Sequence, residues 1–292
     1  GEGNGEVVGV TGDGTNDAPA LKAADVGLAM GSGTRLAREA ADLILLDDHY
    51  ESAVRAIAWG RAVLVNVTSF LQFQVTVSVV ALTLTFIGAV SGSATLTSVQ
   101  LLFVNLIQDS LGALALATEP PTQSLLQRPP HRRSASLFTR AAVRDIAAQA
   151  AYQLGALLAL LFAAPSIFSD MNNGGDRHVT LLFNVFTLAQ VVQIFNIRAA
   201  RTGNYFLVGS NPVFVVVVVL IVALQLVFVQ AGGDWSGTED LHLSEWITSL
   251  ALAAGSAPVA VLARRIDVGG EPKPREPALR PRGGASPSSH LV

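Results

Sequence analysis

The chain has no charged residue between Arg61 and Asp109, a stretch far longer than the roughly 20 residues that cross a bilayer once. The cluster Ser91-Gly92-Ser93 interrupts this stretch. Because glycine and serine clusters favour turns, the sequence predicts a hairpin of two membrane helices, near residues 69–90 and 98–118.

Four further apolar runs follow, near residues 143–163, 179–197, 212–230 and 245–263. A run of five valines such as 215–219 is also typical of a buried strand in a soluble protein. Six apolar runs in tandem, separated by short polar loops, instead favour an all-α membrane domain of six transmembrane helices over residues 63–265.

The basic residues of the loops alternate from one side to the other. Four of them, Arg128, Arg132, Arg133 and Arg140, occur in the loop 119–141, and Arg198 and Arg201 begin the loop 198–211. The loops of the opposite side hold only Arg177. Since cytoplasmic loops carry the excess of Lys and Arg, both ends of the chain are expected in the cytoplasm.

Charge and composition exclude several classes of protein. Of all residues, 14% are charged, against roughly 25% in soluble domains, and there is no cysteine for a disulfide or a thiolate metal site. A net charge of −3 gives nucleic-acid binding no electrostatic support. Residues 266–292 are rich in Pro, Gly, Ser and Arg and are expected to form a disordered cytoplasmic tail.

Residues 1–62 have the pattern of an α/β unit. EVVGVTG reads as a buried strand that ends at Gly12, Pro19 opens a short helix, and VGLAM is a second strand. Thr34 caps the next helix, and LILL forms a third strand that ends at Asp47-Asp48. Strands alternating with helices predict a parallel sheet, whose binding sites lie at the carboxyl ends of the strands.

The turn Thr11–Asp17 (TGDGTND) lies at such a strand end. Its carboxylates and amide are hard oxygen ligands of the kind that Mg²⁺ prefers when it holds a phosphate. The same residue types also form turns and cap helices without any ligand, and the pattern alone leaves both interpretations open.

The segment TGDGTNDAPALKAADVGLAMG resembles the hinge of P-type ATPases, which ends their haloacid-dehalogenase-like (HAD-like) phosphorylation domain, and GTRLAREAADLILLDD continues the resemblance. The resemblance implies that Asp13 coordinates the catalytic Mg²⁺ with Asp17 beside it. It also implies that Asn16 bonds near the phosphoryl group and that Gly12 and Gly14 permit the turn. Such an ion neutralises charge on the transferring phosphoryl group.

The DKTGT motif that carries the family's phosphorylated aspartate does not occur in these 292 residues. The resemblance therefore implies the C-terminal part of a longer chain, with ATP bound mainly by the part that is not included here. The 292 residues alone are not expected to hydrolyse ATP.

Asp109 is the most informative residue of the membrane domain. A carboxylate inside an apolar span is costly and is a functional hypothesis by default. Asn105 precedes it by one helical turn, which predicts that both side chains project from one buried face. The alternative is that both residues only hydrogen-bond neighbouring helices.

GRAVLVNVTSFLQFQVTVSVVA and VQLLFVNLIQDSLGALALATEPP look closest to the calmodulin-stimulated, plasma-membrane type of Ca²⁺ pump. By this resemblance Asn105 and Asp109 are ligands of the transported Ca²⁺, and Gly112 loosens the helix there. Ser78 stands where these pumps have an asparagine ligand, and Ala81 stands where pumps carrying two Ca²⁺ have a glutamate. One Ca²⁺ site is therefore implied, with Gln72, Gln74 and Thr76 as helix-packing residues.

The resemblance implies an ATP-driven pump that exports Ca²⁺ from the cytoplasm, in the plasma membrane or an internal Ca²⁺-storing membrane. Membrane lipid and calmodulin are the implied partners. The tail after Ile266 lacks apolar anchors at helical spacing, so a calmodulin site is expected outside this chain. Alternatives are a pump for Mn²⁺ or another cation, a non-catalytic membrane protein that associates with full-length pumps, and a phosphatase with a membrane anchor. A helix without a strong break, from about Ser52 to Val90, is expected to link the two parts.

Overall fold

The computed structural model describes residues 7–122, 124–127, 136–168, 174–202 and 211–269. It divides into one unit of residues 1–61, 121–135 and 272–292 and a second unit of residues 62–120 and 136–271. Most of the expected disordered tail and the arginines at 128, 132 and 133 lie outside the described residues.

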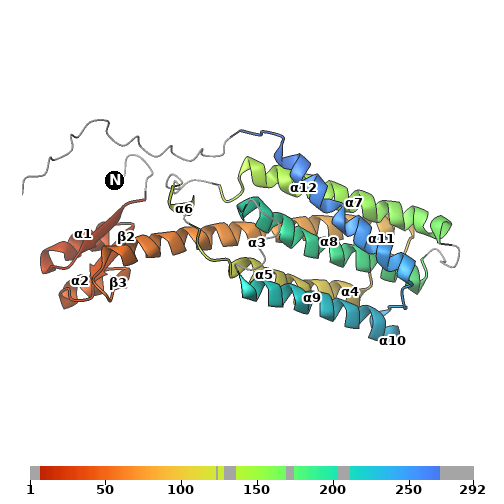
Figure 1. Ribbon diagram of the computed structural model, residues 1–292, viewed down its shortest axis with the longest axis horizontal. Helices are drawn as coiled ribbons and strands as arrows, with labels where there is room; N and C mark the ends of the chain where they lie inside the picture. Colours follow the sequence, from red (N-terminus) through yellow and green to blue (C-terminus); the bar gives the residue numbers. More distant parts are fainter. Residues whose placement is uncertain (1–6, 123, 128–135, 169–173, 203–210, 270–292) are drawn as a thin grey trace, which may run out of the picture. The chain divides into compact units, whose positions relative to one another are not determined.

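The first unit contains a three-stranded parallel sheet in the order β1 (Gly9–Gly12), β2 (Val26–Met30) and β3 (Leu43–Leu45) (Figure 1). Helices α1 (Ala18–Ala23) and α2 (Arg35–Ala40) connect successive strands. Thr34 caps α2 by accepting a hydrogen bond from the N–H of Ala37 at 3.3 Å. The expected α/β unit with a parallel sheet is confirmed.

Six helical segments of the described chain are long and apolar enough to span a membrane, as the sequence predicts. The segments are α3 (Tyr50–Ser91), α4 to α5 (Ser98–Ala117), α7 (Arg140–Ile167), α8 (Asp176–Thr202), α9 (Pro212–Ala231) and α11 to α12 (Leu243–Arg264). Helix α3 runs without interruption from Tyr50, so the continuous helix expected from about Ser52 is confirmed. Short helices α6 (Ser124–Gln127) and α10 (Gly233–Ser236) lie in the connections.

Two of these segments contain a break. A π turn, η2 (Val104–Gln108), separates α4 (Ser98–Phe103) from α5 (Asp109–Ala117). The expectation that Gly112 loosens this segment is wrong, because Gly112 lies inside regular α5, where an added Cβ would be 3.1 Å from the Phe73 ring. Gly255 separates α11 (Leu243–Ala254) from α12 (Ser256–Arg264).

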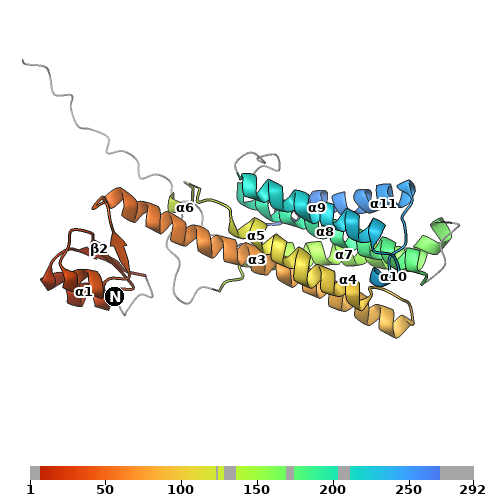
Figure 2. The same ribbon diagram turned by 90° about the horizontal axis from the view of Figure 1, so that it is seen from below.

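Helix α8 is the centre of the second unit. It contacts α5, α7, α9, α11 and α12, and α9 also lies beside α5 (Figure 1, Figure 2). Two of its phenylalanines, Phe183 and Phe186, are fully buried, and so are its polar residues Asn184, Gln190 and Gln193. Because a buried polar group is costly without a partner, α8 must carry hydrogen bonds to its neighbours.

A buried ion pair joins the end of α5 to α8. Glu119 accepts a hydrogen bond from Arg198 at 2.5 Å, and the two side chains are only 7% and 3% exposed. Asn211, the N-cap of α9, donates to the same carboxylate at 3.4 Å. The Arg198 guanidinium lies 4.3 Å from the centre of the Phe214 ring, a cation–π distance.

We expect Arg198→Met to destabilise the protein by about 3–5 kcal/mol, because it leaves the Glu119 carboxylate buried without its cation. Thermal denaturation of the detergent-solubilised protein measures this loss. The double variant Glu119→Gln/Arg198→Met removes both charges and should recover most of the stability. A double variant as unstable as Arg198→Met alone would contradict this account.

Candidate functional site

The turn after β1 is organised by the Asp17 carboxylate. Its Oδ2 atom accepts hydrogen bonds from the N–H groups of Asp13 at 3.1 Å and Gly14 at 2.9 Å. A Cβ at Gly12 would lie 2.5 Å from the Cβ of Asp17, so only glycine lets Asp17 fold back this closely. One oxygen of Asp17 therefore has the turn-forming role that the sequence left open.

Asp13 and Asn16 project from the same turn and are exposed, whereas Asp17 is half-buried. The backbone of Asp13 is held from the other side, because its carbonyl accepts from the N–H of Thr34 at 2.8 Å. None of the hydrogen bonds found within the described residues uses the Asp13 carboxylate. Asp13 thus offers both carboxylate oxygens to a cation, and Asp17 keeps one.

A second carboxylate at this edge of the sheet has a structural role. Asp48, which follows β3, accepts from the N–H of Ser32 at 3.1 Å and so ties the loops after β2 and β3 together. This hydrogen bond holds the pKa of Asp48 below its usual value. The described residues contain no cluster of three or more His, Cys, Asp or Glu side chains, so a cation here would take other ligands as well.

In the second unit, Asp109 begins α5 and is 5% exposed. Its Oδ2 atom accepts a hydrogen bond from Nε2 of Gln74 on α3 at 2.9 Å. Its Oδ1 atom and Oε1 of Gln74 are both buried without a hydrogen-bond partner. The described residues provide Asp109 with no ion pair, so two buried oxygens, one belonging to a carboxylate, remain available at the α3–α5 contact.

The other expected ligands lie differently. Ser78 is half-buried and lies one turn beyond Gln74 on α3, on the same face. Asn105 lies in the π turn and is exposed. The expectation of one shared buried face for Asn105 and Asp109 is wrong, because the wider turn between them changes the angle between residues four apart. In this turn the N–H of Asp109 donates to the carbonyl of Val104, five residues back.

Gln74 is the functional candidate that the sequence analysis assigned only to packing. Its hydrogen bond to Asp109 joins α3 to α5 at the one carboxylate of this hairpin. Its only sequence signal, a polar side chain in a long uncharged span, is shared with Gln72 and therefore does not identify Gln74. Gln108 is fully buried beside Asp109 and donates to the carbonyl of Thr187 on α8 at 2.9 Å, while its own oxygen has no partner.

Two family models match the chain. Residues 93–266 match the family described as "Cation transporting ATPase, C-terminus", and residues 4–57 match "haloacid dehalogenase-like hydrolase". The first match covers more than half of the chain, including α4 to α12. The second covers all three strands of the sheet, in agreement with the expected HAD-like fold.

Similar proteins are named as calcium-transporting ATPases. Calcium-transporting ATPase PAT1 of Dictyostelium discoideum is 43% identical over 94% of this chain and 27% of its own length. Putative calcium-transporting ATPase 13, plasma membrane-type, of Arabidopsis thaliana is 46% identical over 90% of the chain and 26% of its own length. Calcium-transporting ATPase 7, plasma membrane-type, of Oryza sativa subsp. japonica is 47% identical, with the same coverage.

The chain spans about a quarter of the length of these curated relatives. The family match over residues 93–266, the HAD-like match over residues 4–57 and the six apolar helices all agree with the resemblance to P-type ATPases. The chain belongs to the cation-transporting ATPase family and corresponds to its C-terminal region.

Proposed function

We propose that this chain is the C-terminal portion of an ATP-driven Ca²⁺ pump that exports Ca²⁺ from the cytoplasm through a phosphoenzyme cycle. The observation that carries the proposal is Asp109, a carboxylate buried between apolar helices with one oxygen unpartnered. A buried charge without an ion-pair partner requires a cation or a proton. The similarity to calcium-transporting ATPases supports Ca²⁺ as that cation.

In the proposed ion site, the Asp109 carboxylate supplies the charge that offsets dehydration of the ion. Oε1 of Gln74 and the Ser78 hydroxyl supply neutral oxygens from the facing helix, which matches the preference of Ca²⁺ for oxygen ligands. Asn105 is proposed as a further ligand on the family resemblance alone, because it lies on an exposed face. Ser78 fills the position of the family's asparagine with a shorter side chain, so its share in ion binding is the smallest.

In the other unit, Asp13 is the proposed ligand of the catalytic Mg²⁺, with the free oxygen of Asp17 beside it. The bound ion would neutralise charge on a phosphoryl group at the edge of the sheet. Asp17 holds the turn in shape through its other oxygen, and the exposed Asn16 amide is available to hydrogen-bond the phosphoryl group. Gly12 and Gly14 permit this close turn. ATP is bound mainly by residues outside this chain.

Helix α3 is the proposed mechanical link between the magnesium site and the ion site. It begins at Tyr50, five residues after β3, and contains both Gln74 and Ser78 before it ends at Ser91. A movement of the phosphorylation unit would reach the ion site along this helix. Coupling requires that the helix has two positions, which both sites favour differently.

Ion uptake into sealed vesicles tests the proposal. Vesicles that contain the longer protein to which this chain belongs should accumulate Ca²⁺ when ATP and Mg²⁺ are supplied. Uptake of Mn²⁺, measured at the same concentration, distinguishes a Ca²⁺ pump from the closest alternative, a Mn²⁺ pump. Absence of ATP-driven uptake of either ion would favour the non-catalytic alternative. A phosphatase with a membrane anchor is disfavoured by the six apolar helices, since one or two would suffice.

The same proposal places both ends of the chain and the loop 119–141 in the cytoplasm. The absence of cysteine makes labelling convenient. We expect a cysteine at Ser134 to react with an impermeant thiol reagent only after cells are permeabilised. A cysteine at Ser91, where α3 ends, should react in intact cells and serves as the control. The reverse pattern would overturn the orientation.

A further inference from the structure

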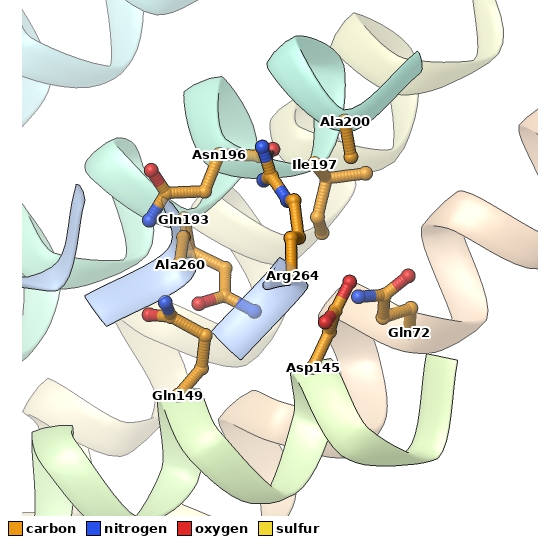
Figure 3. Close-up of a pocket in the computed structure, with 9 residues that line it drawn as sticks. All are labelled: Gln72, Asp145, Gln149, Gln193, Asn196, Ile197, Ala200, Ala260 and Arg264. Atoms are coloured by element: carbon orange, nitrogen blue, oxygen red, sulfur yellow. Dashed lines mark hydrogen bonds between the residues drawn. The ribbon is translucent and has the colours of Figure 1, made fainter. Parts of the chain in front are cut away.

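A small polar cavity in the second unit is lined by residues of α3, α7, α8 and α12 (Figure 3). The side-chain amides of Asn196 and Gln149 point in different directions there, so they do not face one common ligand. The first unit is arranged differently, because the segments that follow its three strands contact one another directly. These contacts end at Asp13.

The loop of residues 31–34 (GSGT) connects β2 to α2 and follows the central strand of the sheet. It leaves no room for a side chain at two positions. A Cβ at Gly31 would lie 2.9 Å from the carbonyl oxygen of Leu45 in β3. A Cβ at Gly33 would lie 3.0 Å from the carbonyl oxygen of Asp13 and 3.2 Å from its Cα. The backbone of this loop therefore packs directly against both β3 and Asp13.

Hydrogen bonds fix the loop to the same two neighbours. The N–H of Gly31 donates to the carbonyl of Leu45 at 2.8 Å, and the N–H of Thr34 donates to the carbonyl of Asp13 at 2.8 Å. The Thr34 hydroxyl is used separately, as the cap of α2. The position of the Asp13 backbone thus depends on where β3 holds this loop.

Asp48 holds the middle of the loop from the segment after β3. Its Oδ1 atom accepts from the N–H of Ser32 at 3.1 Å. Among the described residues, Asp48 is the one non-glycine residue with a positive φ, at 57°. Aspartate is among the few residue types that adopt this conformation, and such a backbone persists where the surrounding contacts determine it. The carboxylate of Asp48 is thereby directed back at the loop.

The neighbouring aspartate has a different task. Asp47 accepts from the N–H of His49 at 3.2 Å and from the hydroxyl of Ser52, in the first turn of α3. Its hydrogen bonds remain within its own segment, whereas that of Asp48 crosses to the loop after β2. Two adjacent carboxylates can therefore be compared, of which one reaches toward Asp13.

We propose that Asp48 is a positioning residue for Asp13, acting through the loop of residues 31–34. The proposal rests on the proposed role of Asp13 as a Mg²⁺ ligand. None of the hydrogen bonds of the described residues fixes the Asp13 carboxylate, so its place relative to an ion is set by its backbone. Asp48 does not touch the ion. It keeps the loop against the end of β3, and the loop keeps the Asp13 backbone in place.

Two substitutions of Asp48 in the full-length protein test the proposal. Asp48→Gly allows the positive φ but removes the acceptor, and Asp48→Asn keeps both. We expect Asp48→Gly to raise the Mg²⁺ concentration for half-maximal phosphorylation about 2–10-fold, the equivalent of one hydrogen bond, with little change in the maximal level. Asp48→Asn should stay close to the unsubstituted protein. Asp47→Ala is the matched control and should not change the Mg²⁺ requirement.

Backbone hydrogen exchange without Mg²⁺ gives a readout that does not depend on the ion. We expect faster exchange in residues 31–34 and in the turn that contains Asp13 for Asp48→Gly, and not for Asp48→Asn or Asp47→Ala. Unchanged exchange in Asp48→Gly would overturn the proposal. An equal rise of the Mg²⁺ requirement in both Asp48 variants would also overturn it, because charge and not the hydrogen bond would then be responsible.

Asp13→Asn, measured in parallel, separates this inference from the magnesium assignment itself. If Asp13→Asn raises the Mg²⁺ requirement and Asp48→Gly does not, the positioning role is rejected and the magnesium assignment stands. If Asp13→Asn has no effect, the magnesium assignment fails, and the positioning role fails with it.

Discussion

Asp109→Asn is expected to abolish Ca²⁺-activated phosphorylation from ATP in the full-length protein. Asparagine keeps the shape of the side chain and can still accept a hydrogen bond from Gln74, but it removes the charge that offsets dehydration of the ion. Loss of one partner from a buried charge pair costs about 3–5 kcal/mol, which corresponds to at least a 100-fold higher requirement for Ca²⁺. Uptake of Ca²⁺ into vesicles measures this shift directly.

Two further measurements separate an ion ligand from a residue that only joins helices. Phosphorylation from inorganic phosphate, which requires an empty ion site, should survive in Asp109→Asn. Membrane insertion should survive as well, since an amide is easier to bury than a carboxylate. If Asp109 only joined helices, the substitution would be almost silent, because asparagine hydrogen-bonds across helices nearly as well. Near-normal uptake at low Ca²⁺ would reject the ligand assignment.

Gln225→Met is the matched control for this experiment. Gln225 is also buried in the membrane domain, where it donates to Asn184 at 3.1 Å, and it carries no charge. Its substitution removes one hydrogen bond between α8 and α9 and should lower the melting temperature without changing the Ca²⁺ requirement. A shift in the Ca²⁺ requirement of both variants would indicate a general loss of packing.

The secondary structure could be predicted from the sequence because its signals are local. The strand VGLAM coincides with β2, and Thr34 caps α2 through its own hydroxyl. Apolar runs of membrane length gave all six spans within a few residues, apart from α3, which starts far earlier. This early start agrees with the continuous helix expected from about Ser52, because no helix-breaking residue lies between Ser52 and Gly60, a feature that hydropathy alone does not measure.

The geometry of the membrane residues could not be predicted, because it depends on the partners of each side chain. A regular helix places Asn105 and Asp109 on one face, whereas the π turn between them leaves Asn105 exposed and Asp109 buried. Gln72 and Gln74 are the same residue type, two positions apart on α3, so the sequence does not distinguish them. Only the packing of α3 against α5 shows that Gln74 is the residue that reaches Asp109.

Asp13→Asn is expected to raise the Mg²⁺ concentration required for phosphorylation by at least about 10–100-fold. Mutation of even an outer-shell partner of a metal typically lowers metal affinity by this factor. The physical reason is that Asp13 is exposed at the strand end and none of the hydrogen bonds of the described residues occupies its carboxylate. Ca²⁺ binding should remain intact, because Asp13 belongs to the other unit. Phosphorylation from ATP at graded Mg²⁺ concentrations, with Ca²⁺ binding measured in parallel, checks both expectations.

Two acidic residues of the same unit provide the controls. Asp42 accepts from the N–H of Gly27 at 2.9 Å, so Asp42→Asn keeps a structural acceptor and should leave the Mg²⁺ requirement unchanged. Asp17→Asn keeps an oxygen for the N–H groups of Asp13 and Gly14 but loses charge beside the ion, and its effect should be smaller than that of Asp13→Asn. If activity and Mg²⁺ dependence are unchanged in Asp13→Asn, the turn serves only to connect β1 to α1, and the magnesium assignment fails.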